Sequence, residues 1–281
     1  MFKKKEKEKI PVRGFIFAQV WGRKFCCIRE MGIERVARNA SKAVKFESKA
    51  AEIRYEENIQ NRPLSVEKEF VWDNSKPLEQ PPFIADVIIQ HNWQLFCAHP
   101  EDPIVPLVRE FYTNMTNPDD DTVYIRGVQV PLSVEAINTI FSLGDPIDEH
   151  SEFVEDITKP ELVIVLETVA IVGAEWNVSS QGAYTCLRSS LNPPAKVWYH
   201  FLKSRLLPTT HGKTVSKEHV SLLYSMLTGK SINVGRMIHR EICACAARKS
   251  GALFFPSLIT SMCRNTRAPY LVNEEKLHNT G

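Results

Sequence analysis

Apolar residues recur along much of the chain at intervals of three and four, the spacing of one face of an α-helix. The clearest case is the segment 233–249, whose apolar positions form one stripe: Val234, Met237, Ile238, Ile242 and Cys245. The same spacing runs more weakly through about 83–96 and 107–115. A charged, alanine-rich pattern with few helix breakers extends from Ile33 to Asn58. These patterns predict a mainly helical protein.

Capping residues indicate where several helices begin and end. Thr158 followed by Glu161 has the form of a capping box, which predicts a helix at about 159–171. Gly229 occupies the position of a glycine that ends a helix in a left-handed conformation. Ser133, Asn192 and Ser216 are expected to cap further helices, the last two at about 193–207 and 217–228, and another helix is expected at about 256–263.

Two short runs rich in β-branched and aromatic residues flank Arg126-Gly127, and this arrangement is typical of a β-hairpin with a tight turn. We therefore expect a mainly α fold, a single multi-helix globular domain with one small β-hairpin near 122–131. The expected organisation is a basic, partly disordered and partly helical N-terminal extension (1–58), the domain itself (59–272) and a short tail (273–281).

Charge is distributed very unevenly along the chain. Apolar residues make up 43% and charged residues 24%, which is ordinary for a globular protein, and the net charge is only +2. Residues 59–190, however, hold 7 Lys/Arg against 21 Asp/Glu, whereas residues 191–272 hold 12 against 2. The middle is therefore strongly acidic and the C-terminal third strongly basic.

The basic C-terminal third supplies the candidate binding residues of the chain. Lysine and arginine can bind nucleic acid through its phosphates, and aromatic residues among them can stack on bases. The same charges can instead dock on the acidic middle or lie on solvated helix faces. The candidate nucleic-acid-binding residues are Lys196, Lys203, Arg205, Lys213, Lys217, Lys230, Arg236, Arg240, Arg248 and Lys249.

The sequence shows no feature of a membrane or secreted protein. It has no run of about 18 apolar residues, and its basic N-terminus lacks the apolar stretch of a signal peptide. The seven cysteines are irregularly spaced, which indicates reduced thiols and not a disulfide framework. We expect an intracellular protein of the nucleus or cytoplasm with no membrane partner.

The string Gly229-Lys230-Ser231 resembles the end of a phosphate-binding P-loop. A P-loop needs a glycine five residues earlier, and that position holds Tyr224. It also follows a strand, whereas the residues before Gly229 have a helical pattern. We therefore expect the end of a helix followed by a short loop.

No complete catalytic or metal motif is present. His239 and Cys243 share a helical face, but a zinc site needs four convergent ligands, so we expect no metal and no cofactor. A metal-dependent nuclease would require several acids to converge from the acidic middle, and the candidates are Asp86, Glu110, Asp119, Asp121 and Glu135. No Gly-x-Ser-x-Gly elbow occurs, and no cysteine lies in a recognisable reactive motif.

Several strings resemble one known family in the same order along the chain. They include Val-Arg-Glu-Phe-Tyr-Thr-Asn-Met at 108–115, Val-Tyr-Ile-Arg-Gly at 123–127, Trp-Tyr-His-Phe at 198–201, Arg-Leu-Leu-Pro-Thr-Thr-His at 205–211 and Phe-Pro-Ser-Leu-Ile-Thr at 255–260. The chain resembles the plant transposon protein domain family over about 46–272. The resemblance implies an origin in transposable-element coding sequence, and it supplies no catalytic residues.

The leading hypothesis is a non-catalytic helical interaction domain derived from a plant transposable element. Its expected partner is nucleic acid or another element-encoded protein, bound through the basic C-terminal third, and its oligomeric state is open. Two alternatives remain: a metal-dependent nuclease or transposase with scattered acidic ligands, and a self-associating capsid-like or scaffold protein.

Overall fold

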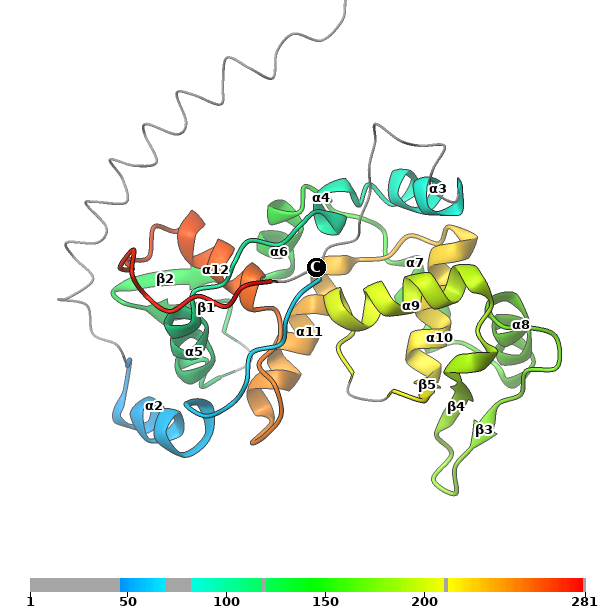
Figure 1. The fold of residues 1–281 in the computed structure, drawn as a ribbon, viewed down its shortest axis with the longest axis horizontal. Helices are drawn as coiled ribbons and strands as arrows, with labels where there is room; N and C mark the ends of the chain where they lie inside the picture. Colours follow the sequence, from blue (N-terminus) through cyan, green and yellow to red (C-terminus); the bar gives the residue numbers. More distant parts are fainter. Residues whose placement is uncertain (1–45, 69–81, 118–119, 210–211, 280–281) are drawn as a thin grey trace, which may run out of the picture.

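A computed structural model describes residues 46–68, 82–117, 120–209 and 212–279, and it is mainly helical (Figure 1). Of the predicted N-terminal extension 1–58, only 46–58 lies within the described residues. The helices are α2 Lys49–Arg54, α3 Pro82–Gln90, α4 Gln94–Cys97, α5 Val105–Asn114, α6 Val134–Ile140, α7 Glu149–Glu155, α8 Lys159–Val169, α9 Pro193–Arg205, α10 Lys217–Thr228, α11 Val234–Ala247 and α12 Pro256–Asn265. A π-helical turn, Tyr55–Ile59, continues α2, and the 3-10 turn η3, Arg188–Ser190, precedes α9.

The predicted hairpin is confirmed. Strands β1 (Thr122–Ile125) and β2 (Val128–Pro131) pair antiparallel, with Ile125 opposite Val128. Both turn residues have positive φ, 49° at Arg126 and 89° at Gly127, which suits the right-handed twist of a two-residue hairpin. The Arg126 side chain folds back to pair with the buried carboxylate of Glu110 at 2.8 Å.

A second, three-stranded sheet was not predicted. Its strands β3 (Asn177–Val178), β4 (Tyr184–Leu187) and β5 (Thr214–Ser216) pair antiparallel in that order. It lies beside α8, at the end of the molecule opposite the hairpin (Figure 1). Strands of two to four residues are too short to show alternation, and β4 pairs with β5 across the whole of α9.

The predicted caps are confirmed where they were expected. The side chains of Ser133, Thr158, Asn192 and Ser216 each accept a backbone N–H at the start of α6, α8, α9 and α10. The capping box of Thr158 and Glu161 is complete. The expected helix through 83–96 is instead two helices, because the chain turns at Asn92, whose φ is 56°. Helix α7, capped by Asp148, was not predicted.

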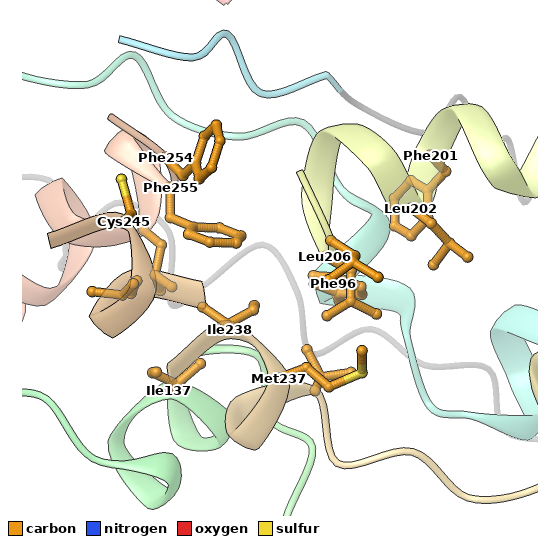
Figure 2. Close-up of a cluster of buried hydrophobic side chains, with 14 of the residues drawn as sticks. Phe96, Ile137, Phe201, Leu202, Leu206, Met237, Ile238, Cys245, Phe254 and Phe255 are labelled. Atoms are coloured by element: carbon orange, nitrogen blue, oxygen red, sulfur yellow. The ribbon is translucent and has the colours of Figure 1, made fainter. Parts of the chain in front are cut away.

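One apolar core connects most of these elements. Figure 2 shows buried side chains of α4, α6, α9 and α11 together with the Phe254-Phe255 pair that precedes α12, all of which belong to one cluster. Trp93 and Trp198 are both fully buried there, with ring centroids 6.4 Å apart. This core fixes α9 along one side only, so the opposite side of α9 faces outward.

Two segments near the ends of the described chain are tied to other elements by hydrogen bonds. The Arg62 guanidinium donates to the carbonyl oxygens of Gly251 and Arg248 at 2.8 and 3.0 Å, which ties residues 60–68 to the loop before α12. At the other end, the Val105 N–H donates to the Glu275 carbonyl at 2.9 Å.

No helix in the described ranges has the length and apolar character needed to span a bilayer.

Candidate nucleic-acid interface

The Gly229-Lys230-Ser231 string forms a loop that holds the start of α7. Gly229 ends α10 with a φ of 78°. The Ser231 N–H and hydroxyl both donate to the Glu149 carboxylate, at 2.7 and 3.0 Å, and these bonds lower the pKa of Glu149. The Lys230 ammonium lies 4.9 Å from the centre of the Phe153 ring. A carboxylate of the chain itself thus takes the donors that a P-loop would offer to phosphate, so this string has a structural role.

The acidic candidates do not converge within the described residues. Asp86, Asp121 and Glu135 are exposed on separate elements, while Glu110 is buried against Arg126. Asp119 lies outside the described residues. Across the described ranges, no three His, Cys, Asp or Glu side chains are grouped so that they could hold a metal ion. His239 and Cys243 do approach each other, with Sγ 3.8 Å from Nδ1.

Two serine–histidine pairs are found among the described residues, one buried and one partly buried. The Ser225 hydroxyl is 2.8 Å from His150 Nδ1, and both residues are buried. Burial lowers the pKa of His150 to about 4. Ser216 Oγ lies 2.8 Å from His219 Nδ1 while it caps α10. A substrate would have to enter the core to reach Ser225, so these contacts serve packing and capping.

The buried thiols have no features of reactive cysteines. Burial raises the pKa of Cys97 and Cys263 to about 12 and that of Cys186 to about 11. The thiolate is the nucleophilic form, and at neutral pH these groups stay protonated.

The arginines of α11 are largely compensated by carboxylates. Arg236 pairs with Asp148 of the acidic middle at 3.5 Å. Arg240 pairs with Glu218, and it also lies 3.7 Å from the carboxylate of Glu241. Arg248 lies 4.0 Å from Glu241 as well. This group of candidates therefore presents less net positive charge than its sequence indicates.

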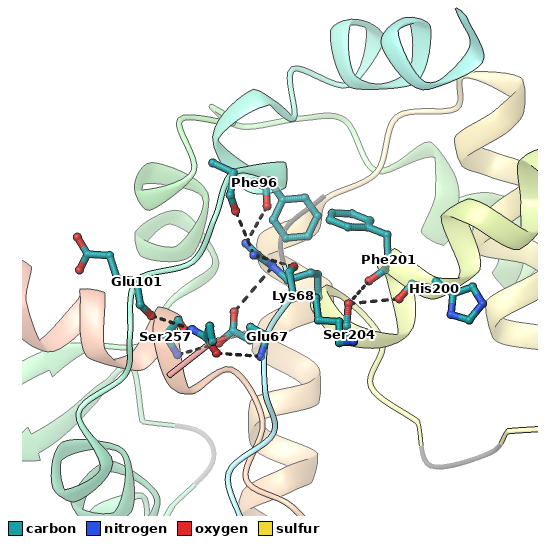
Figure 3. A network of polar contacts seen from close by, with 11 residues as sticks. Glu67, Lys68, Phe96, Glu101, His200, Phe201, Ser204 and Ser257 are labelled. Atoms are coloured by element: carbon teal, nitrogen blue, oxygen red, sulfur yellow. Dashed lines mark hydrogen bonds and ion pairs between the residues drawn. The ribbon is translucent and has the colours of Figure 1, made fainter. Parts of the chain in front are cut away.

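Arg205 is a buried structural residue. Only 3% of it is exposed, and its guanidinium donates to the carbonyl oxygens of Phe96, Ala98 and Lys68 at 2.8, 3.2 and 3.3 Å (Figure 3). It also lies 3.8 Å from the buried Glu67 carboxylate. Burial lowers the pKa of Arg205 and raises that of Glu67. Arg205 thus joins α4, α9 and the N-terminal segment, and its charge is not available at the surface.

The outward side of α9 carries basic side chains that, unlike Arg205, are at least partly exposed. Lys196, His200 and Lys203 are spaced by four and three residues, which aligns them on one helical stripe, and Arg188 precedes them in η3. We call these four residues the α9 basic face. Each is at least partly exposed, and none makes a side-chain hydrogen bond or ion pair with another described residue. In Figure 3 the His200 ring points away from the polar network around Arg205.

The charged groups that perturb His200 are cations. Its pKa is lowered by burial and then by the nearby charges of Arg188, Lys203 and Lys68. A half-open hollow of about 260 Å³ lies beside it, lined by Arg188, Ser189, Lys196 and His200. The face thus combines a concave surface with uncompensated positive charge.

Comparison with known proteins identifies the origin of this fold. A family model described as "Putative plant retrotransposon-related domain" matches residues 89–269. The chain belongs to this family. No curated protein and no solved structure matches the chain. The expected resemblance to plant transposon domains is therefore confirmed, and the α9 basic face lies within the matched part of this retrotransposon-related domain.

The candidate residues of the retrotransposon-related domain separate into distinct groups. Lys196 and Lys203 lie together on the α9 basic face. Lys213 is exposed, and its carbonyl accepts the Arg188 N–H at 2.9 Å. Lys217 begins α10 and Lys249 follows the end of α11. Sequence reasoning did not single out Arg188 or His200. The helical spacing of Lys196, His200 and Lys203 could have indicated that His200 shares the face of the two lysines.

Proposed function

We propose that this retrotransposon-related domain is a non-catalytic interaction domain that binds nucleic acid through the α9 basic face. The observation that carries the proposal is that Arg188, Lys196 and Lys203 share one outward surface with no carboxylate partner among the described residues. Lysine and arginine side chains on such a surface attract phosphates and release condensed counterions when they bind them.

The distribution of carboxylates favours α9 over α11 as the binding surface. The carboxylates of Asp148, Glu218 and Glu241 accompany the arginines of α11, so a phosphate approaching α11 would meet negative charge. The charged groups that perturb His200 are all cations. Opposite charges attract and like charges repel over several ångströms, so a polyanion is expected to settle on α9.

The burial of the aromatic residues favours recognition of the backbone over recognition of bases. Trp198, Tyr199 and Phe201 are 0%, 1% and 3% exposed, so they do not offer rings for stacking. Base stacking on aromatic rings is a common contribution to single-strand binding. Without these rings, affinity would come mainly from phosphate contacts, which carry little sequence information.

A filter-binding titration of the full chain against duplex DNA, single-stranded DNA and RNA tests the proposal. We expect binding at low salt whose logarithmic affinity falls linearly with the logarithm of salt concentration. Little discrimination between unrelated sequences of the same type is expected. The absence of binding at low salt, or an affinity that does not depend on salt, would contradict the proposed function.

A further inference from the structure

Helix α8 has apolar residues on both of its sides. Its inner side is buried through four residues: Leu162, Val165, Leu166 and Val169. Its outward side carries Val163 and Ile164, which are 51% and 54% exposed. A surface helix normally has polar residues on its outward side, and a helix that is apolar all round is normally covered on both sides. The outward side of α8 is therefore a surface that lacks a cover among the described residues.

Two further aliphatic residues extend this surface past the end of α8, and hydrogen bonds hold it in place. Ile171 and Val172 directly follow the helix, and both are exposed. The Ile171 N–H donates to the Ser190 carbonyl at 2.8 Å, and the Asn192 side-chain amide donates to the Thr168 carbonyl at 3.0 Å. These bonds fix the end of α8, so a partner would find the surface already formed. We call the four aliphatic residues the α8 apolar surface: Val163, Ile164, Ile171 and Val172.

Carboxylates accompany the α8 apolar surface. Residues 145–175, from the loop before α7 to the turn after α8, hold nine Asp/Glu and one Lys/Arg. Four exposed carboxylates lie next to the surface along the chain: Glu155 and Asp156 before α8, Glu167 within it and Glu175 after it. Two copies of the chain that met through this surface would bring like charges together, which opposes their association. The surface therefore fits a segment that combines apolar residues with positive charge.

The chain itself contains a segment of this character, outside the described residues. Residues 10–24 include eight apolar residues, three Lys/Arg and no Asp/Glu, and five lysines precede them at 3–9. The described chain begins near α2, at the opposite end of the molecule from α8 (Figure 1). Residues 25–45 can span at most about 70 Å, whereas a domain of this size has a radius of gyration of about 17 Å. The segment is therefore able to reach α8.

We propose that residues 10–24 dock on the α8 apolar surface of the same chain. Their apolar side chains would cover Val163 and Ile164, and their cations would lie beside carboxylates such as Glu167. Charge complementarity of this kind selects one partner over another more than it adds affinity. Tethering within one chain raises the local concentration of the segment, so a weak contact is sufficient to hold it. The contact is independent of nucleic-acid binding, and it would make the residues that precede the family match a component of the folded domain.

Paramagnetic relaxation in the full chain tests the contact. A nitroxide is attached to Cys26, two residues after the segment, in a chain that carries Cys27→Ser and Cys243→Ser. The other described cysteines are buried, so Cys26 is the thiol that reacts. The nitroxide broadens the nuclear magnetic resonance signals of isoleucine and valine methyl groups that lie near it. The methyl signals therefore report which exposed surface the segment occupies.

We expect the nitroxide to broaden the signals of Ile164 and Val172 strongly. Ile53 on α2 and Ile89 on α3 are also exposed, and their signals should broaden less. Ile53 is the stringent control, because it is closer to the segment along the chain and lies at the other end of the molecule from α8 (Figure 1). A tethered segment that does not dock would broaden Ile53 at least as much as Ile164, and that result would overturn the proposal.

Matched variants assign the broadening to the α8 apolar surface. Ile164→Lys changes an exposed side chain and adds a charge that repels the segment, so it should reduce the broadening of Val172 several-fold. Glu167→Gln should reduce it to a smaller extent. Ile89→Lys and Glu56→Gln, which make the same changes at exposed positions on α3 and beside α2, should leave it unchanged. Equal broadening of Val172 in the α8 variants and in these controls would contradict the docking site.

A mixed sample separates contact within one chain from contact between copies. Chains that carry the nitroxide but no isotope label are combined with isotope-labelled chains that carry no nitroxide. We expect no broadening of Ile164 in this mixture, since each segment covers its own α8. Broadening in the mixture as strong as in the singly labelled chain would assign the α8 apolar surface to a second copy and would overturn the proposal.

Discussion

Replacing Arg205 tests the distinction between structural and surface cations on α9. The substitution Arg205→Met keeps much of the side-chain volume and removes the guanidinium, whose hydrogen bonds reach three carbonyl oxygens. It also leaves the Glu67 carboxylate, which is 4% exposed, without its nearest cation. Lys203→Met on the outward side of the same helix is the matched control.

The structure sets the size of the expected effect. Removing one partner of a buried ion pair costs about 3–5 kcal/mol, because the other charge remains buried without compensation. In a protein of this size each kcal/mol corresponds to about 2–4 °C in the melting temperature, so Arg205→Met should lower it by about 6–20 °C. Lys203→Met should change the free energy of unfolding by about 0.5 kcal/mol or less.

Urea denaturation followed by circular dichroism measures both variants. Glu67→Gln and the double variant complete a cycle that isolates the interaction between the two side chains. The double variant should be more stable than the sum of the two single losses predicts, since it leaves no unpaired buried charge. An Arg205→Met variant that loses less than about 1 kcal/mol, or no more than Lys203→Met, would refute the structural role of Arg205.

Two further predictions concern groups buried or constrained elsewhere in the fold. Since burial lowers the pKa of His150 from 6.5 to about 4, the unfolded chain takes up a proton first as the pH falls, and about 3 kcal/mol of stability should be lost between pH 6.5 and pH 4. His150→Gln should show a smaller loss in that window, and equal pH profiles for the two proteins would contradict this. Gly229→Ala should destabilise the fold by about 1–2 kcal/mol in urea denaturation, because φ is 78° and a left-handed backbone is strained for a residue with a Cβ, whereas the exposed end of the Gln90 side chain can move away from it. Gly127→Ala, at a φ of 89° with open space around it, should show a loss of similar size, and a Gly229→Ala variant as stable as the wild-type chain would contradict the strain argument.

Local signals in the sequence were sufficient for most helices. A helix cap such as that of Thr158 with Glu161 depends only on residues within one turn of the chain, so it can be predicted without knowledge of the rest of the fold. The three-stranded sheet depends instead on pairing β4 with β5 across α9, and no local pattern carries that information. The break at Asn92 was missed because the apolar spacing continues on both sides of it.

The candidate surface was only partly predictable for a related reason. Lys203 and Arg205 are two residues apart on one helix, yet one is partly exposed and the other is buried against Glu67. A count of charges along the sequence gives Lys203 and Arg205 the same weight. Likewise, the fold brings Arg236 of the basic C-terminal third beside Asp148 of the acidic middle, so that the two charges compensate each other. The helical position of each cation, and not the total charge, distinguishes the α9 basic face.

The most direct test of the nucleic-acid role compares the salt dependence of binding for two double variants. Lys196→Ala with Lys203→Ala removes two charges from the α9 basic face, and Arg236→Ala with Arg240→Ala removes two charges from α11. Each lost phosphate contact on duplex DNA should reduce the slope of log affinity against log salt by about 0.9. We predict a slope that is shallower by about 2 for the α9 variant and nearly unchanged for the α11 variant. Equal slopes for the wild-type chain and the α9 variant would contradict the assignment of this face as the nucleic-acid-binding surface.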